Sequence, residues 1–247
     1  MSGPISLQGG CEHLEPAIPI DRRLLELVGA ARPLVAVLPL AASRRTRARV
    51  AQLARDHWAG IGAAALIAGL PTQTLCESME SIERADVIVL PGGHPRKLMN
   101  ALGASPLLER IRERWHEGCG LSGSSAGAMC LFERQLRLYP PNPLRLEPGF
   151  GLLSRFVAAP HFDRLRARHW APWFARLLGG RGVLGLDEST GLVGHPGDLG
   201  VVGQGAVTVI ETGVTNIYSP GEQVAILLPQ PTRTLQARQV AGRNTAS

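Results

Sequence analysis

The sequence predicts an α/β fold with a mostly parallel, doubly wound sheet, flanking helices and a β-rich C-terminal part. Two patterns lead to this fold class. Short apolar runs alternate with amphipathic segments between residues 34 and 132, which is typical of parallel strands joined by crossover helices. Beyond residue 190, short strand-like segments separated by Gly-rich turns replace that alternation.

The first half of the chain contains the clearest elements. Continuous apolar runs predict buried strands, and Ser43 is placed to cap the helix that follows the first of them. The expected elements are a strand at 34–39, a helix after Ser43, strands at 64–68 and 86–90, helices at 95–102 and 106–117, a strand at 119–123 and a helix from 125 to about 132.

The second half is expected to continue with strand 156–160, helix 164–178 and strand 182–186, followed by strands at 191–194, 199–203, 206–210, 216–218 and 224–228. Residues 1–30 are expected to form an N-terminal arm and a helix, and residues from about 229 to 247 a frayed tail. No repeat or composition break divides the 247 residues, so they are taken as a single α/β domain.

Composition argues against several classes of protein. The longest uncharged apolar run, residues 59–71, is too short to span a bilayer, and the N-terminus lacks the features of a signal peptide, which predicts a cytoplasmic protein without a membrane partner. The net charge is +6, but the arginine clusters lack interleaved aromatics, so no nucleic-acid partner is expected. Four scattered cysteines, with no C-x-x-C pair, predict neither a metal site nor a disulfide framework. The oligomeric state stays open.

The most informative motif is Gly123-x-Ser125-x-Gly127, at a predicted strand-to-helix junction. A serine on such a sharp turn is exposed for attack, and only small residues fit two positions before and after it. The helix that begins there also presents free N–H groups to a developing oxyanion. The pentapeptide alone leaves a tight structural loop equally open, because the chain contains 29 glycines.

A nucleophilic serine needs a base, and the base needs an orienting acid. Among seven histidines, His161 stands at the end of a predicted strand, where the serine should also be exposed. Asp187 and Glu188 follow another strand, and chemistry alone does not choose between them. Cys130 lies five residues past the serine and is expected to pack, with a catalytic thiol as the lesser alternative.

The motifs together resemble the family of serine peptidases that contains dipeptidase E and cyanophycinase, which has a class I glutamine amidotransferase-like fold. The order serine, histidine, acid differs from the order in ordinary α/β-hydrolases. The matching segments are the elbow Gly123-Ser-Ser-Ala-Gly-Ala128, Leu90-Pro-Gly-Gly93, Gly149-Phe-Gly-Leu-Leu153, His161-Phe162 and Gly185-Leu-Asp-Glu188.

The resemblance implies a hydrolase in which Ser125 is the nucleophile, His161 the base and Glu188 the acid that orients it. The oxyanion hole is then expected from the backbone N–H groups of Gly92, Gly93 and Ala126. We expect no metal and no organic cofactor. The expected substrate is a small peptide or another amide.

Further substrate contacts are expected from His94, Asp187 and Arg164. The family often has Asn where this chain has His94, and its arginines after His-Phe are shifted, so neither cyanophycin nor N-terminal aspartate is carried over as the substrate. For Arg164, helix-surface charge is the stronger alternative. Two other functions stay open: an amidase or glutaminase-like hydrolase using the same serine, and a non-catalytic ligand-binding relative.

Overall fold

The computed structural model describes residues 2–137, 145–164, 178–224 and 226. Its elements are β1 (Ile5–Gln8), the 3-10 helix η1 (Glu15–Ala17), α1 (Ile18–Val28), β2 (Leu34–Val37), α2 (Arg44–Gly60), β3 (Ala64–Ile67), α3 (Leu75–Glu83), β4 (Val87–Leu90), α4 (Pro95–Leu102), α5 (Pro106–His116), β5 (Gly120–Ser124), α6 (Ala126–Leu131), β6 (Arg134–Arg137), β7 (Arg145–Pro148), β8 (Phe156–Pro160), β9 (Gly182–Leu186), β10 (Thr190–His195), β11 (Asp198–Gly203), β12 (Val207–Glu211), β13 (Val214–Tyr218) and β14 (Gln223–Val224).

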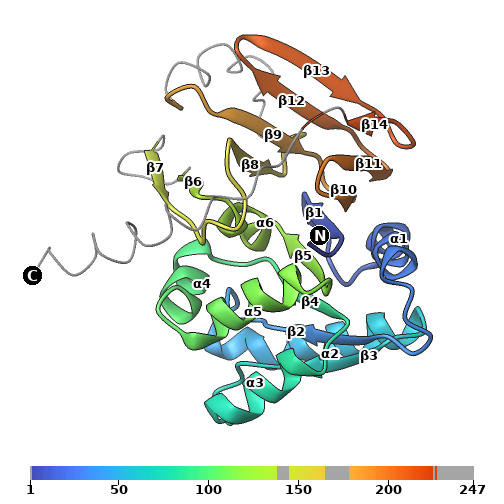
Figure 1. Ribbon diagram of the computed structural model, residues 1–247, viewed down its shortest axis with the longest axis vertical. Coiled ribbons are helices and arrows are strands. Elements are labelled where there is room, and N and C mark those ends of the chain that lie inside the picture. Colours follow the sequence, from blue (N-terminus) through green and yellow to red (C-terminus); the bar gives the residue numbers. More distant parts are fainter. Residues whose placement is uncertain (1, 138–144, 165–177, 225, 227–247) are drawn as a thin grey trace, which may run out of the picture.

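The predicted α/β fold is confirmed. The described strands form an eight-stranded sheet in the order β14-β11-β10-β1-β5-β4-β2-β3, a four-stranded sheet in the order β13-β12-β9-β8, and the hairpin β6-β7 (Figure 1). Strands β3, β2, β4, β5 and β1 run parallel, whereas β10, β11 and β14 are antiparallel additions. The carboxyl ends of β1, β4 and β5 therefore meet at one edge of the large sheet.

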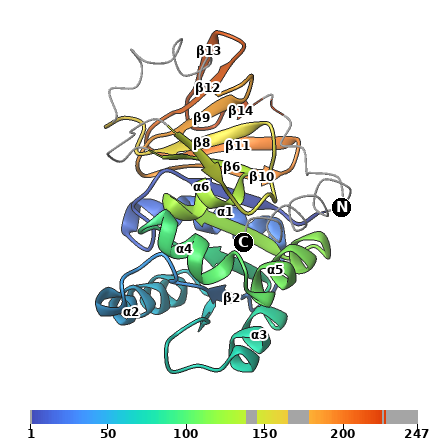
Figure 2. The same ribbon diagram turned by 90° about the vertical axis from the view of Figure 1, so that its left-hand side faces the viewer.

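Helices cover both faces of the large sheet. Helices α1 and α2 pack on one face, α1 over β10, β11 and β1 and α2 over β3 and β2, and Ile20, Leu24 and Trp58 are fully buried there. Helices α4, α5 and α6 bury Leu98, Trp115 and their neighbours on the other face. Figure 2 shows α2 and α3 on opposite sides of β2. None of the helices in the described part of the chain combines the length and hydropathy needed to cross a membrane.

The β-rich C-terminal part forms a second layer of structure rather than an extension of the large sheet alone. Strands β8 and β9 are parallel neighbours, with Pro160 opposite Leu186, and β9 pairs antiparallel with β12. The chain then crosses from β9 in the small sheet to β10 in the large sheet within residues 187–189. The helix expected at 164–178 and the tail expected from about 229 lie largely or wholly outside the described residues.

The N-terminal segment differs most from expectation. Residues 5–8 were expected in an irregular arm, but they form β1, a fully buried strand between β5 and β10. The apolar pattern does not reveal this strand, because the polar residues Ser6 and Gln8 alternate with its two apolar residues. Their burial is tolerated since the Gln8 amide donates to Asp21 Oδ1 at 2.7 Å and lies 3.3 Å from Ser122 Oγ.

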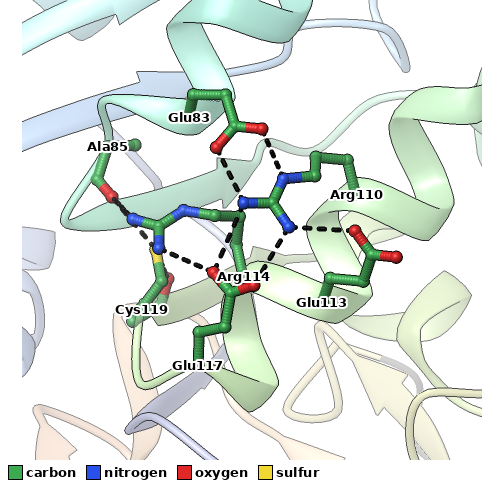
Figure 3. A network of polar contacts seen from close by, with 8 residues as sticks. Glu83, Ala85, Arg110, Glu113, Arg114, Glu117 and Cys119 are labelled. Carbon is green, nitrogen blue, oxygen red and sulfur yellow. Dashed lines mark hydrogen bonds and ion pairs between the residues drawn. The ribbon is translucent and has the colours of Figure 1, made fainter.

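An ion-pair network ties α3 to α5. Arg110 contacts Glu83 through two nitrogens at 2.6 and 2.7 Å and also reaches Glu113 and Glu117 (Figure 3). Arg114 extends the network to the Ala85 carbonyl at 2.8 Å. The Arg110 hydrogen bonds hold the pKa of the Glu83 carboxyl below its usual value.

Replacing Arg110 by Met should lower the melting temperature by about 2–4 °C at neutral pH. Because the folded-state pKa of Glu83 is depressed, its contribution is present above the unfolded pKa and disappears as pH falls through the folded pKa. The difference between variant and wild type should therefore shrink in acid, as thermal unfolding at several pH values would measure. Arg23→Met, which breaks one exposed pair with Glu26, is the matched control and should change little; equal effects would contradict the network.

Candidate active site

Ser125 occupies a strained turn between β5 and α6. Its backbone has φ 47° and ψ −110°, a conformation that residues with a side chain rarely adopt. The turn is possible only with small neighbours: a Cβ at Gly127 would lie 1.9 Å from the Leu90 carbonyl oxygen, and one at Gly123 would lie 2.8 Å from Ala128 N. The sequence-predicted elbow is therefore present, with its serine half-buried.

Three side chains from distant parts of the sequence form one hydrogen-bonded chain. Ser125 Oγ lies 2.9 Å from His161 Nε2, and His161 Nδ1 lies 2.7 Å from Glu188 Oε1. The side chain of His161 is 39% exposed, whereas that of Glu188 is 14% exposed. The imidazole thus joins an accessible hydroxyl to a shielded carboxylate, the arrangement that activates a serine.

The three residues do not share one sheet, although a single sheet edge was expected. Ser125 follows β5 of the large sheet, while His161 and Glu188 follow the parallel strands β8 and β9 of the small sheet. The end of β1 joins the two edges. Gly9 accepts a hydrogen bond from His161 N at 3.1 Å, and a Cβ at Gly10 would lie 2.6 Å from the His161 ring.

Glu188 has additional partners around its carboxylate. Cys11 Sγ lies 3.7 Å from Oε2, and the Arg164 guanidinium forms an ion pair with the same oxygen. Asp163 accepts a hydrogen bond from the Glu188 backbone N–H at 3.1 Å. Arg164 was expected to contact the substrate, but it pairs with the Glu188 carboxylate instead. Its neighbour Asp163 accepts the hydrogen bond from the Glu188 backbone.

The Gly92–Gly93 turn lies against the serine, but one expected oxyanion donor is already engaged. The Gly92 N–H donates to Glu12 Oε1 at 2.7 Å, so it is not free for a substrate oxygen. Among the described residues, the N–H groups of Gly93 and Ala126 have no hydrogen-bond partner. The expectation for Gly92 is corrected, while Gly93 and Ala126 remain the candidate donors.

The two other expected substrate contacts lie differently. Asp187 is 8% exposed, and its carboxylate accepts a hydrogen bond from Ala206 N at 2.9 Å, so it stabilises a loop rather than facing the serine. His94 is exposed at the start of α4. It borders a cavity of about 220 Å³ that is also lined by Pro95, Arg96, Gln135, Leu136, Arg137 and Glu147.

The lesser alternative of a catalytic thiol at Cys130 is not supported by its surroundings. Cys130 is fully buried, and burial raises the pKa of its thiol to about 12. A thiol in that state is a poor nucleophile at neutral pH. His57, another histidine of the chain, forms a buried pair with Asp21 at 2.8 Å.

Sequence reasoning missed the loop after β1. In this loop, the backbone of Gly9 and Gly10 packs closely on His161. Cys11 places its thiol beside Glu188, and the carboxylate of Glu12 accepts the Gly92 N–H. A signal was present, because Gly9-Gly10 follows a short run with two apolar residues, as Gly92-Gly93 follows β4. The polar residues within that run concealed the strand.

The α/β fold and the aligned serine, histidine and carboxylate are the arrangement expected of a serine hydrolase. The chain belongs to peptidase family S51, whose model matches residues 6–199. The resemblance to the family of dipeptidase E and cyanophycinase is thereby confirmed.

Curated relatives and solved structures are similar over different shares of the chain. A cyanophycinase from Geminocystis herdmanii (strain PCC 6308) is 28% identical over 160 residues, which cover 59% of this chain and 57% of the relative. A cyanophycinase from Trichormus variabilis (strain ATCC 29413 / PCC 7937) is 30% identical over 158 residues, covering 59% of this chain and 53% of the relative. The chain thus spans little more than half the length of these curated relatives.

The crystal structure of a peptidase from an acI-B1 Actinobacterium has a TM-score of 0.75 and 26% identity, and the match covers 92% of this chain and 98% of that one. A putative peptidase E protein from Listeria monocytogenes EGD-e has a TM-score of 0.58, with 91% and 100% coverage. At 13% identity, the second likeness concerns the fold alone.

Proposed function

We propose that this S51 peptidase is a serine-type enzyme that cleaves small peptides, as dipeptidases do, through Ser125, His161 and Glu188. The observation that carries the proposal is the continuous pair of contacts, 2.9 Å from serine to imidazole and 2.7 Å from imidazole to carboxylate. A ligand-binding relative would not need this alignment at a strained serine.

In the proposed reaction, neutral His161 accepts the Ser125 proton at Nε2 while Oγ attacks the scissile carbonyl carbon. Glu188 accepts the Nδ1–H bond and stabilises the imidazolium that forms. The carbonyl oxygen gains negative charge and is met by the N–H groups of Gly93 and Ala126. His161 then protonates the leaving amine. Next, His161 takes a proton from water while the water oxygen attacks the acyl carbon, and it returns that proton to Ser125 Oγ as the acid product leaves.

Two observations bear on the proposed substrate class. The relatives named cyanophycinase are 28% and 30% identical to this chain over stretches that cover 59% of it, and these stretches are little more than half of each relative. A small peptide is proposed over that substrate. Arg96, which borders the cavity next to His94, favours a peptide with an acidic group, whereas Arg137 on the same cavity already pairs with Glu147 at 2.9 Å.

Labelling and profiling test the function directly. A fluorophosphonate should modify Ser125 of the folded protein, as peptide mapping by mass spectrometry would show. A dipeptide library assayed beside free amides and cyanophycin should give turnover with dipeptides. Absence of an adduct would favour the binding-protein alternative, and turnover of free amides alone would favour an amidase.

The pH dependence should identify the base. Protonation of an imidazole removes the lone pair that accepts the serine proton, so kcat/KM should fall as the pH is lowered. Initial rates in buffers of constant ionic strength would measure this. A rate that stays constant between about pH 5 and 8 would contradict a histidine base.

A further inference from the structure

The carboxylate of Glu12 joins the loop after β1 to the loop after β4 and to the last residue of β5. It lies in the loop after β1, its Oε1 accepts the Gly92 N–H at 2.7 Å, and its Oε2 accepts the Ser124 hydroxyl at 2.8 Å. Gly92 follows β4, and Ser124 immediately precedes the proposed nucleophile. Glu12 therefore connects the candidate oxyanion turn to the elbow without contacting the serine hydroxyl itself.

The turn held by Glu12 packs closely on the elbow. A Cβ at Gly92 would lie 2.5 Å from Glu12 Oε1 and 3.2 Å from Ser125 Cβ, so there is no room for a side chain between them. On the other side of Gly93, the His94 N–H donates to the Ala41 carbonyl at 2.9 Å. The N–H groups flanking Gly93 are thus both fixed, and the Gly93 N–H stays available.

We propose that Glu12 is a positioning residue, whose carboxylate holds the Gly92–Gly93 turn so that the Gly93 N–H faces the oxyanion. This inference rests on the proposed function. Glycines impose little restriction on their own backbone, so a Gly-Gly turn requires outside anchors to keep one orientation. A carboxylate suits the task because its two oxygens accept the N–H and the O–H at once, both as charge-assisted bonds.

Three variants separate this role from a general structural one. Glu12→Ala removes both hydrogen bonds. Glu12→Gln keeps the shape and an acceptor for the Gly92 N–H, and its amide can donate to Ser124 after the hydroxyl rotates. Glu15→Ala is the matched control, because it removes an exposed carboxylate three residues away in η1.

The expected result is a loss in kcat with KM largely preserved. A misplaced oxyanion donor typically costs about 10²-fold in kcat, so Glu12→Ala should lose about that factor while KM changes less than about threefold. The rate of fluorophosphonate labelling should fall similarly, since the phosphoryl oxygen enters the same hole. Glu12→Gln should recover activity to within about tenfold of wild type, and Glu15→Ala should match wild type.

Several outcomes would overturn the inference. A folded Glu12→Ala protein with unchanged kcat and labelling would do so, as would a change confined to KM. If Glu12→Ala does not fold, Ser124→Ala removes one of the two hydrogen bonds and should slow labelling about 3- to 10-fold; an unchanged rate would reject the role. Failure of wild type to label or turn over would reject the proposed function itself, whereas a labelled wild type beside an equally labelled Glu12→Ala would reject only the positioning role.

Discussion

Ser125→Ala should reduce peptide turnover by at least about 10⁴-fold while leaving the protein folded. The change removes only the Oγ that lies 2.9 Å from His161 Nε2. Alanine fits the same turn, because the positive φ strain is already present with serine and the Cβ is retained. The melting temperature should therefore stay within about 2 °C of wild type. Progress curves and thermal unfolding, measured on one preparation, check both parts.

The matched control for this variant is Ser81→Ala. Ser81 is half-buried on α3, and its hydroxyl donates to the Glu77 carbonyl of the same helix at 2.9 Å. Its loss should leave both turnover and fluorophosphonate labelling at the wild-type level. A folded Ser125→Ala protein that keeps full activity would show that another group attacks the substrate, and labelling of that variant would locate it.

Glu188→Gln should give the second-largest effect, a fall in kcat of about 10²- to 10⁴-fold. The neutral amide no longer stabilises the imidazolium, and its NH₂ group can favour the wrong imidazole tautomer. The substitution keeps side-chain size in a largely shielded position, so KM should change little. Steady-state kinetics with a reactive ester and a peptide would separate the two parameters.

Glu211→Gln controls for loss of a carboxylate in the same small sheet. Glu211 ends β12 and pairs with Arg155 at 2.6 Å. If the effect of Glu188 came only from destabilising that sheet, the two variants would lose activity and melting temperature together. A near-normal kcat for Glu188→Gln would instead assign the orientation of His161 to another group.

Local patterns were enough to predict much of the fold. The strands at 156–160 and 182–186 were predicted with their observed bounds, because uninterrupted apolar runs end at polar residues there. Ser43 caps α2 as expected, since its side chain accepts the Thr46 N–H at 3.2 Å. Such elements depend on neighbours within a few positions, which the sequence displays directly.

The sequence indicated which residues form the candidate site, but not which strands and sheets carry them. The residue types and their positions at strand ends indicated Ser125, His161 and either Asp187 or Glu188, and the family resemblance selected Glu188. Their assignment to two sheets depends on strand pairing between distant segments, which no local pattern records. The engagement of Gly92 by Glu12 joins residues 80 positions apart, so only the folded chain reveals it.

Strand β1 also joins segments that lie far apart in the sequence, so the candidate site can form only late in folding. Residues 5–8 are made early, yet their antiparallel neighbours at 191–194 are made about two hundred positions later. Until those residues leave the ribosome, one side of β1 has no partner, and the loop that supports the imidazole cannot be fixed. Assembly of the proposed site therefore requires residues 191–194 to pair with β1.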